Sequence, residues 1–179
     1  MLKIVIGLPG CGKTALLAQL HSEGYLIFDE FHAEADAPFV EMSPNFGPLM
    51  DELLAEHHCA VSDNAFCEPQ YRSEFLKAVK TRLPNQAMEW IYFENAPEKC
   101  RNNIIAGDGE RVERDLSALQ GLSKRYVIPA GVATLQIVDQ QRDTLKVSIG
   151  DWRAMSEAAD IEFESPRSPG DLHKPTDPS

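Results

Sequence analysis

The chain has 179 residues, of which 43% are hydrophobic and 25% are charged, a composition typical of one globular domain. Its formal net charge of −11 disfavours long nucleic acids, because an acidic surface repels phosphate backbones and releases no counterions from them. No apolar run reaches the roughly 20 residues of a membrane-spanning helix, and the amino terminus lacks the layout of a signal peptide. We therefore expect a cytoplasmic protein with no membrane contact and a small substrate; a local basic groove for nucleic acid stays open.

Four cysteines are present, and none of them forms a closely spaced pair or a zinc-binding pattern. We expect Cys59 and Cys100 to be reduced thiols in or near the core. Cys11 lies in a glycine-rich segment, where we expect its backbone N–H to matter more than its sulfur.

The first third of the chain alternates between apolar runs and helical patterns. Buried strands are predicted at 2–6, 25–28 and 59–62, and helices at 13–21 and roughly 48–57. Residues 30–48 are predicted to be irregular, because prolines and a glycine interrupt any periodicity. A stretch of that length inside a compact domain is often a functional loop.

The remaining two thirds continue the alternation. Helices are predicted at 69–82 and 97–105, each opened by a proline, with a strand at 88–93 between them. A glycine-bearing charged segment covers 106–114, a further helix runs to about Tyr126, and a fifth strand covers 134–138. A sixth strand at 145–149 is an option, and the proline-rich end from about residue 165 predicts a disordered tail.

This order of elements predicts an α/β fold with three layers, in which a mostly parallel sheet has helices on both faces. We expect one domain over residues 1–150 and a carboxy-terminal extension over 151–179. Ligands of such sheets bind beyond the carboxyl ends of the strands. Asp29, Asp63 and Glu94 fall at such ends, as does the glycine-rich segment after the first strand.

That segment reads Gly7-Leu8-Pro9-Gly10-Cys11-Gly12-Lys13-Thr14 and matches the phosphate-loop pattern GxxxxGK[ST] at every fixed position. It follows a predicted strand and opens a predicted helix, which is the context that the pattern requires. We expect Lys13 to reach the β- and γ-phosphates and the Thr14 hydroxyl to bind Mg²⁺. The predicted nucleotide-binding residues are Gly7, Pro9, Gly10, Cys11, Gly12, Lys13 and Thr14. The alternative is a glycine-rich turn that only begins a helix.

Two aspartates at strand ends are candidates for the chemistry. Asp29 is the predicted general base that accepts the proton of an attacking hydroxyl, with Glu30 as the substitute if Asp29 faces away. Asp63 is predicted to support Mg²⁺, directly or through water. For both aspartates the alternative is a cap of the following turn or helix.

Arginines after the fourth strand are candidates for a catalytic lid. Gly107 and Gly109 precede Arg111 and Arg114, and Arg101 lies one helix upstream. Glycines can act as hinges, and arginines stabilise the charge that develops on a transferred phosphoryl group. The alternative is that these are surface arginines paired with neighbouring acidic side chains.

These residues resemble the small P-loop kinases. The likeness rests on the motif GLPGCGKT, the strand that ends at Asp29, the stretch VSDNAF at 61–66, and the arginine segment after 95–101. The chain is most similar to the kinase domain of polynucleotide 5′-kinases and to the related small kinases that include zeta toxins, over roughly residues 1–140. The resemblance implies a five-stranded parallel core, ATP or GTP as phosphate donor, and Mg²⁺.

The resemblance also implies roles for individual residues. It places the acceptor-activating carboxylate at Asp29, the residue after the third strand at Asp63, and the lid at Arg101, Arg111 and Arg114. Polynucleotide kinases usually have a basic residue soon after the Asp29 position, whereas acidic residues follow here. This difference favours a small acceptor.

The leading hypothesis is therefore a kinase that uses Mg²⁺ to transfer the γ-phosphate of ATP to a hydroxyl of a small molecule. A 5′-hydroxyl polynucleotide kinase is the first alternative. A nucleotide-dependent ATPase or switch protein is the second. The sequence leaves open the acceptor, the choice between ATP and GTP, and the oligomeric state.

Overall fold

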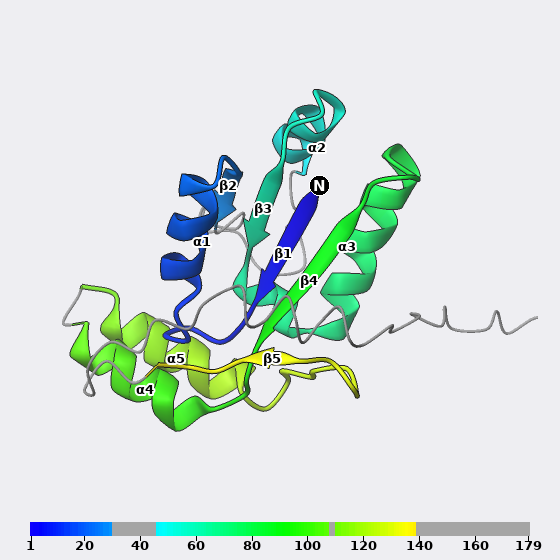
Figure 1. Ribbon diagram of the computed structural model, residues 1–179. Coiled ribbons are helices and arrows are strands. Elements are labelled where there is room, and N and C mark those ends of the chain that lie inside the picture. Colours follow the sequence, from blue (N-terminus) through cyan, green and yellow to red (C-terminus); the bar gives the residue numbers. More distant parts are fainter. Residues whose placement is uncertain (30–45, 108–109, 139–179) are drawn as a thin grey trace, which may run out of the picture.

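A computed structural model describes residues 1–29, 46–107 and 110–138 of the chain (Figure 1). Within these residues five strands form one sheet in the order β2-β3-β1-β4-β5, and every neighbouring pair is parallel. The strands are β1 Leu2–Ile6, β2 Leu26–Asp29, β3 Cys59–Ser62, β4 Met88–Phe93 and β5 Thr134–Leu135. The predicted α/β class and the parallel sheet are confirmed.

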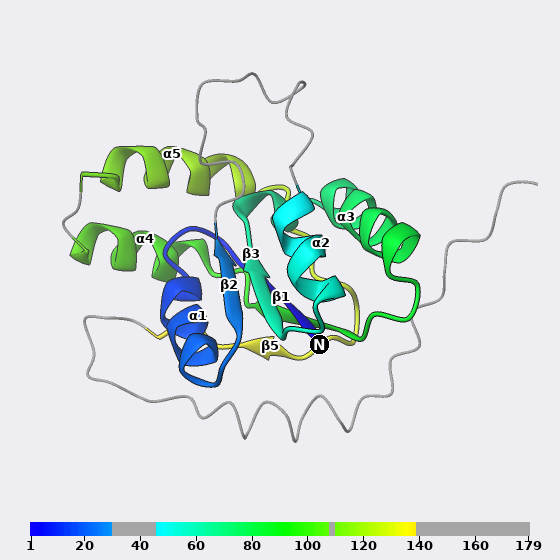
Figure 2. The same ribbon diagram turned by 90° about the horizontal axis from the view of Figure 1, so that it is seen from above.

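The helices of the described ranges cover both faces of this sheet. They are α1 Lys13–Ser22, α2 Gly47–Leu54, α3 Pro69–Arg82, α4 Pro97–Ala106 and α5 Val112–Leu122, together with a short 3-10 helix, η1, at Asn64–Cys67. Figure 2 shows α1 on one face and α2 and α3 on the other. Helices α4 and α5 lie side by side near the carboxyl ends of the strands (Figures 1 and 2).

The core is centred on β1, whose five residues are all buried. Ile4 pairs in register with Val61 on one side and with Trp90 on the other. A central parallel strand has helices over both faces, so nearly all of its side chains must be apolar. Leu17 and Leu20 of α1 complete the core on one face.

Several predicted bounds are wrong by a few residues. Helix α2 begins at Gly47 rather than 48, since Pro48 is tolerated in a first turn, and it ends at Leu54, because the chain turns at Glu56 with a φ of 63°. Helix α5 already begins at Val112 and ends at Leu122. Strand β5 covers only two of the five residues predicted for it.

Other predictions lie outside the described residues. These are the functional loop over most of 30–48, Glu30 as the substitute base, Gly109 as a hinge, the sixth strand at 145–149, and the extension 151–179 with its tail. Within the described ranges, all four cysteines are free and buried. No described helix combines the length and the apolar character that crossing a membrane requires.

Candidate functional site

A cleft of about 260 Å³ lies at the carboxyl ends of the strands. We call it the strand-end cleft. Five parts of the chain contribute side chains or backbone to it: the glycine-rich loop (residues 7–14) with the start of α1, the end of β2, η1, α4 and α5. Its lining residues are Pro9, Gly10, Gly12, Lys13, Thr14, Ala15, Asp29, Asn64, Asn103 and Asp115.

The glycine-rich loop has the backbone shape of an anion site. Gly10 and Gly12 have φ angles of 78° and 105°, a left-handed region in which residues with a Cβ are strained. Gly12 precedes α1 and caps it without a side chain, and the first turn of α1 has no acidic residue. The backbone N–H groups that begin a helix lack partners within it, and the helix dipole is positive there, so an anion is favoured.

Lys13 places a positive charge within this loop. Its Nζ donates hydrogen bonds to the Gly7 carbonyl at 2.9 Å, to the Leu8 carbonyl at 3.1 Å and to Asn64 Oδ1 at 3.1 Å. All three protons of the ammonium therefore have acceptors, and two of the acceptors belong to the loop itself. This arrangement holds the positive charge of Lys13 beside the N-terminus of α1, and both features favour negative charge at this place.

The two predicted carboxylates differ in position. Asp29 is exposed at the end of β2 and lines the strand-end cleft. Asp63 is only 5% exposed and is not among the lining residues, and its Oδ1 accepts a hydrogen bond from the Ala65 N–H at 2.7 Å. Asp63 thus caps η1, which is the alternative that its sequence position allowed, and a role with Mg²⁺ stays a prediction.

The three predicted lid arginines are exposed, and none of them is among the described residues that line the cleft. Arg114 Nε lies 3.3 Å from Oδ1 of Asp115, so the α5 side chain that reaches the cleft is the carboxylate and not the guanidinium. Arg101 and Arg111 lie on α4 and at the start of α5. A lid role for these arginines stays a prediction.

Four lining residues were not predicted from the sequence: Ala15, Asn64, Asn103 and Asp115. Asn64 directly follows Asp63, so its place after a strand was a usable signal. Asn103 is 8% exposed, and its Nδ2 donates to the Gly10 and Val138 carbonyls, each at 3.0 Å. Its partners lie 93 and 35 residues away, and no local pattern indicates such contacts.

Three thiols pack near the glycine-rich loop in their neutral form. Burial raises the pKa of Cys67 and of Cys100 to about 12 and also raises the pKa of Cys11, and the charge of Lys13 offsets part of each increase. A neutral thiol is a poor nucleophile. These cysteines therefore serve as small apolar groups.

Glu94, the third carboxylate at a strand end, ties β4 to β5. Its Oε1 accepts from Lys99 Nζ at 2.7 Å and from the Ile137 N–H at 2.9 Å. Burial acts to raise the pKa of Glu94, but these bonds together leave it below its usual value. Glu94 is absent from the residues described around the cleft, so we assign it a structural role.

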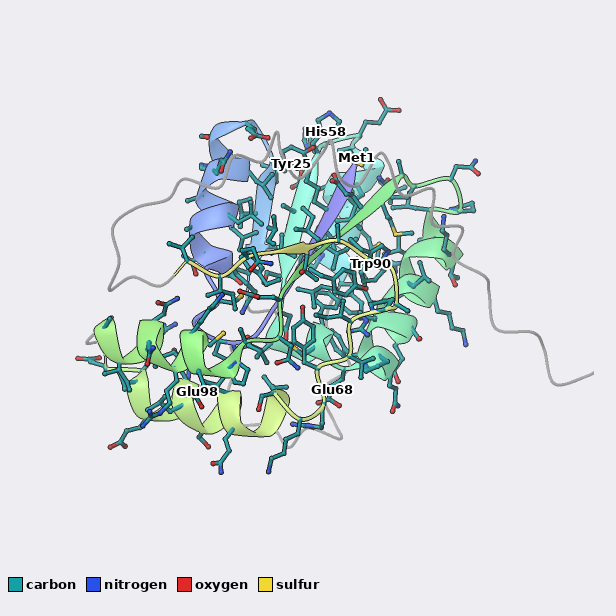
Figure 3. All side chains as sticks on the ribbon, turned by 60° about the horizontal axis from the view of Figure 1, so that its bottom comes forward. Met1, Tyr25, His58, Glu68, Trp90 and Glu98 are labelled. Carbon is teal, nitrogen blue, oxygen red and sulfur yellow. The ribbon has the colours of Figure 1, made fainter. Side chains whose placement is uncertain are left out.

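The opposite end of the sheet has a different character. The Met1 amino group lies 3.1 Å from His58 Nδ1, and the rings of Tyr25 and His58 are 5.6 Å apart. Figure 3 shows these three residues together, away from α4 and α5. These contacts join β1, β2 and β3 at the ends remote from the strand-end cleft.

Comparison with known proteins places the chain beside a viral relative. No model of a known protein family matches it. Over 125 residues it is 30% identical to "Uncharacterized protein R277" of Acanthamoeba polyphaga mimivirus, a match that covers 70% of this chain and 85% of the viral protein. At this identity and coverage, the chain belongs to the same family as the mimivirus protein.

Proposed function

We propose that the chain is a P-loop kinase that binds a nucleoside triphosphate at Gly7–Thr14 and transfers its terminal phosphoryl group to a hydroxyl of a small molecule. The observation that carries this proposal is the composition of the strand-end cleft. The glycine-rich loop, Lys13 and the carboxylate of Asp29 all line one hollow at the carboxyl ends of parallel strands. In sheets of this kind, ligands bind at that position.

Phosphate binding is supported by two independent features of the loop. Its left-handed glycines and the start of α1 offer backbone N–H groups to phosphate oxygens. The Lys13 ammonium belongs to the same loop, where it donates hydrogen bonds to two loop carbonyls and to Asn64. In phosphoryl transfer, catalysis depends on positioning and on neutralising the charge of the transferred group, and a lysine here serves both.

The donor set of the cleft suits Mg²⁺. Thr14 offers a hydroxyl, and the carboxylate of Asp29 can hold a water of the ion while it stays free to accept a proton; oxygen ligands are the ones that Mg²⁺ prefers. In the described residues no cluster of three or more histidine, cysteine or acidic side chains is arranged as a metal cage. Mg²⁺ is usually held by one or two protein ligands plus water and phosphate, so these residues fit it. When bound, the ion would neutralise charge on the phosphate oxygens.

The acceptor hydroxyl belongs on the side of Asp29. An ionised carboxylate at the end of β2 can accept the proton that the attacking hydroxyl loses. A second carboxylate, Asp115, faces the same cleft from α5. Two carboxylates repel the phosphates of a polynucleotide, and this supports a small acceptor without anionic groups over a nucleic acid.

The decisive experiment measures phosphate transfer. Purified protein with Mg²⁺ and γ-labelled ATP is incubated with a panel of nucleosides and sugars, and transfer to each acceptor is compared with release of free phosphate. We expect transfer to at least one small acceptor. The variant Lys13→Ala should lower turnover by about 100-fold or more, because it removes a charge from the transition state.

Lys77→Ala is the matched control, since it removes an exposed lysine on α3 that is not among the lining residues. It should leave turnover unchanged. Equal turnover by wild type and Lys13→Ala would contradict the proposal. Release of free phosphate with no acceptor labelled would favour the ATPase alternative instead, and labelling of 5′-hydroxyl oligonucleotides alone would favour the polynucleotide kinase.

A further inference from the structure

Asn103 joins three segments of the chain at the wall of the strand-end cleft. Its side-chain amide donates one hydrogen bond to the Gly10 carbonyl and one to the Val138 carbonyl, each at 3.0 Å. The side chain is 8% exposed, so this contact is largely protected from water. Helix α4 is thereby linked to the glycine-rich loop and to the chain that leaves β5.

The hydrogen bond to Gly10 acts on one particular peptide unit of the loop. The carbonyl of Gly10 and the N–H of Cys11 belong to the same planar group and rotate together. Asn103 holds the carbonyl, and the Cys11 N–H donates to the Leu8 carbonyl at 3.2 Å. With both ends held, this peptide cannot flip, and the N–H groups that follow keep one orientation.

Helix α4 also supports the loop by direct packing. A Cβ added at Gly10 would lie 2.4 Å from the Cys100 carbonyl oxygen and 2.7 Å from Cγ1 of Ile104. The backbone of Gly10 therefore rests on the turn of α4 that carries Asn103. Helix α4 and Gly10 are therefore packed so closely that no side chain fits at position 10, and the Asn103 amide bonds to the loop beside this contact.

We propose that Asn103 is a positioning residue that holds the glycine-rich loop in its triphosphate-binding shape. This inference rests on the proposed function. It assigns to α4 a part in nucleotide affinity that differs from the lid role predicted for its arginine. The loop can tilt or flip at Gly10 when the amide is lost, and its N–H groups then no longer converge on a phosphate.

The test compares Asn103 with its neighbour Asn102, which lies on the same helix and is half-exposed. Asn103→Ala and Asn102→Ala remove the same amide from adjacent helical positions. Binding of Mg·ATP and of Mg·GTP is measured by calorimetry at 10 °C, with circular dichroism to show that each variant is folded. We expect Asn103→Ala to raise the dissociation constant roughly tenfold, because it leaves the Gly10 carbonyl without its donor. Asn102→Ala should change it by less than about twofold.

A second variant separates positioning from packing. Asn103→Asp keeps the shape of the side chain but turns a carboxylate toward two carbonyl oxygens, so its affinity should fall at least as far as that of Asn103→Ala. If Asn103→Asp does not fold, the alanine pair decides alone. If the alanine variant fails to fold, the amide shifts of Cys11 and Gly12 in Asn103→Ser decide, and we expect both to move.

The outcomes distinguish the two proposals. If wild type and Asn103→Ala bind a triphosphate equally well, the positioning role is wrong and the kinase proposal stands. This holds even if the melting temperature of Asn103→Ala is lower. If wild type binds neither triphosphate, both are wrong.

Discussion

At the scale of single residues, Asp63 and Asn64 show how neighbours at one strand end divide two tasks. Asp63 is buried and caps η1, whereas Asn64 turns its Oδ1 to Lys13 in the strand-end cleft. The cap brings Asn64 into place, since η1 begins at that residue. Asp63, the residue predicted from the sequence, thus positions Asn64, whose amide lines the cleft.

This division predicts different costs for two substitutions of Asp63. Asp63→Ala should lower the free energy of unfolding by about 1–2 kcal/mol, because the buried Ala65 N–H loses its acceptor. Asp63→Asn keeps an acceptor oxygen in the same place and should retain most of that stability. Urea denaturation followed by circular dichroism measures both.

The same pair of variants tests the predicted role with Mg²⁺. If Asp63 only caps η1, Asp63→Asn transfers phosphate at the wild-type rate. A stable Asp63→Asn protein with a strongly reduced rate would show that the charge itself is needed. Equal stability of Asp63→Ala and wild type would contradict the cap.

At the scale of secondary-structure elements, an ion pair links the central strand to its neighbour. Lys3 of β1 pairs in register with Glu89 of β4, and their charged atoms are 2.7 Å apart. The Lys3 side chain is 2% exposed, and its Nζ lies 5.4 Å from the centre of the Tyr25 ring. Burying this lysine is tolerable only while Glu89 compensates its charge.

The pair therefore predicts unequal effects on stability when one or the other member is replaced. Glu89→Ala should destabilise the protein by about 3 kcal/mol, because it leaves the buried Lys3 ammonium without a compensating charge. Lys3→Met should be close to neutral, because methionine fills the same space without a charge. In the double variant most of the loss caused by Glu89→Ala should disappear. Thermal and urea unfolding of the three variants measure this, and a Lys3→Met protein as unstable as Glu89→Ala would refute it.

The bounds of the interior strands were predictable from the sequence, whereas the length of the edge strand β5 was not. The strands at 2–6, 59–62 and 88–93 have the predicted bounds, because burial on both faces demands apolar runs that end where the sheet ends. Among the described residues β5 pairs with β4 alone, so its length depends on that one partner, and no pattern within 134–138 reveals it. Asn103 likewise depends on how α4 packs on Gly10.

Of the candidate site, the glycine-rich loop and Asp29 were predicted to face a common edge, and both line the strand-end cleft. Motif and strand order place such residues at one edge, because the carboxyl ends of all strands of a parallel sheet lie there. They do not decide which of these residues reach the cleft, since Asp63 and Glu94 lie at the same edge and are not among its lining residues. Residues contributed by α4 and α5 were not predictable in the same way. Their placement depends on the angle of two helices, which the sequence pattern does not encode.

At the scale of the whole molecule, the net charge favours the proposed small ligand, a triphosphate at the loop, over a polyanion. The chain carries a net charge of −11, and within the described ranges the acidic residues that line the cleft around Lys13 are Asp29 and Asp115. Such a surface gives a polyanion little attraction beyond the loop, since screening in physiological salt limits each charge to roughly 8–10 Å. A triphosphate needs only the loop, the helix start and one ammonium.

Binding at that one place should stabilise the entire domain by mass action. Mg·ATP or Mg·GTP at a concentration 100 times its dissociation constant should raise the free energy of unfolding by about 2.7 kcal/mol, because it binds the folded state alone. For a domain of this size the melting temperature then rises by roughly 5–10 °C. Differential scanning fluorimetry measures the shift, and the nucleotide with the larger shift at equal concentration identifies the preferred base.

Two variants locate the effect within the fold. Lys13→Ala should lose the shift, because it removes the charge held inside the loop. His58→Ala, at the opposite end of the sheet, removes contacts to Met1 and Tyr25 and should melt at a lower temperature while showing the full wild-type shift. An undiminished shift in Lys13→Ala would mean that the nucleotide binds away from the strand-end cleft, since stabilisation by a ligand disappears only with the site that binds it.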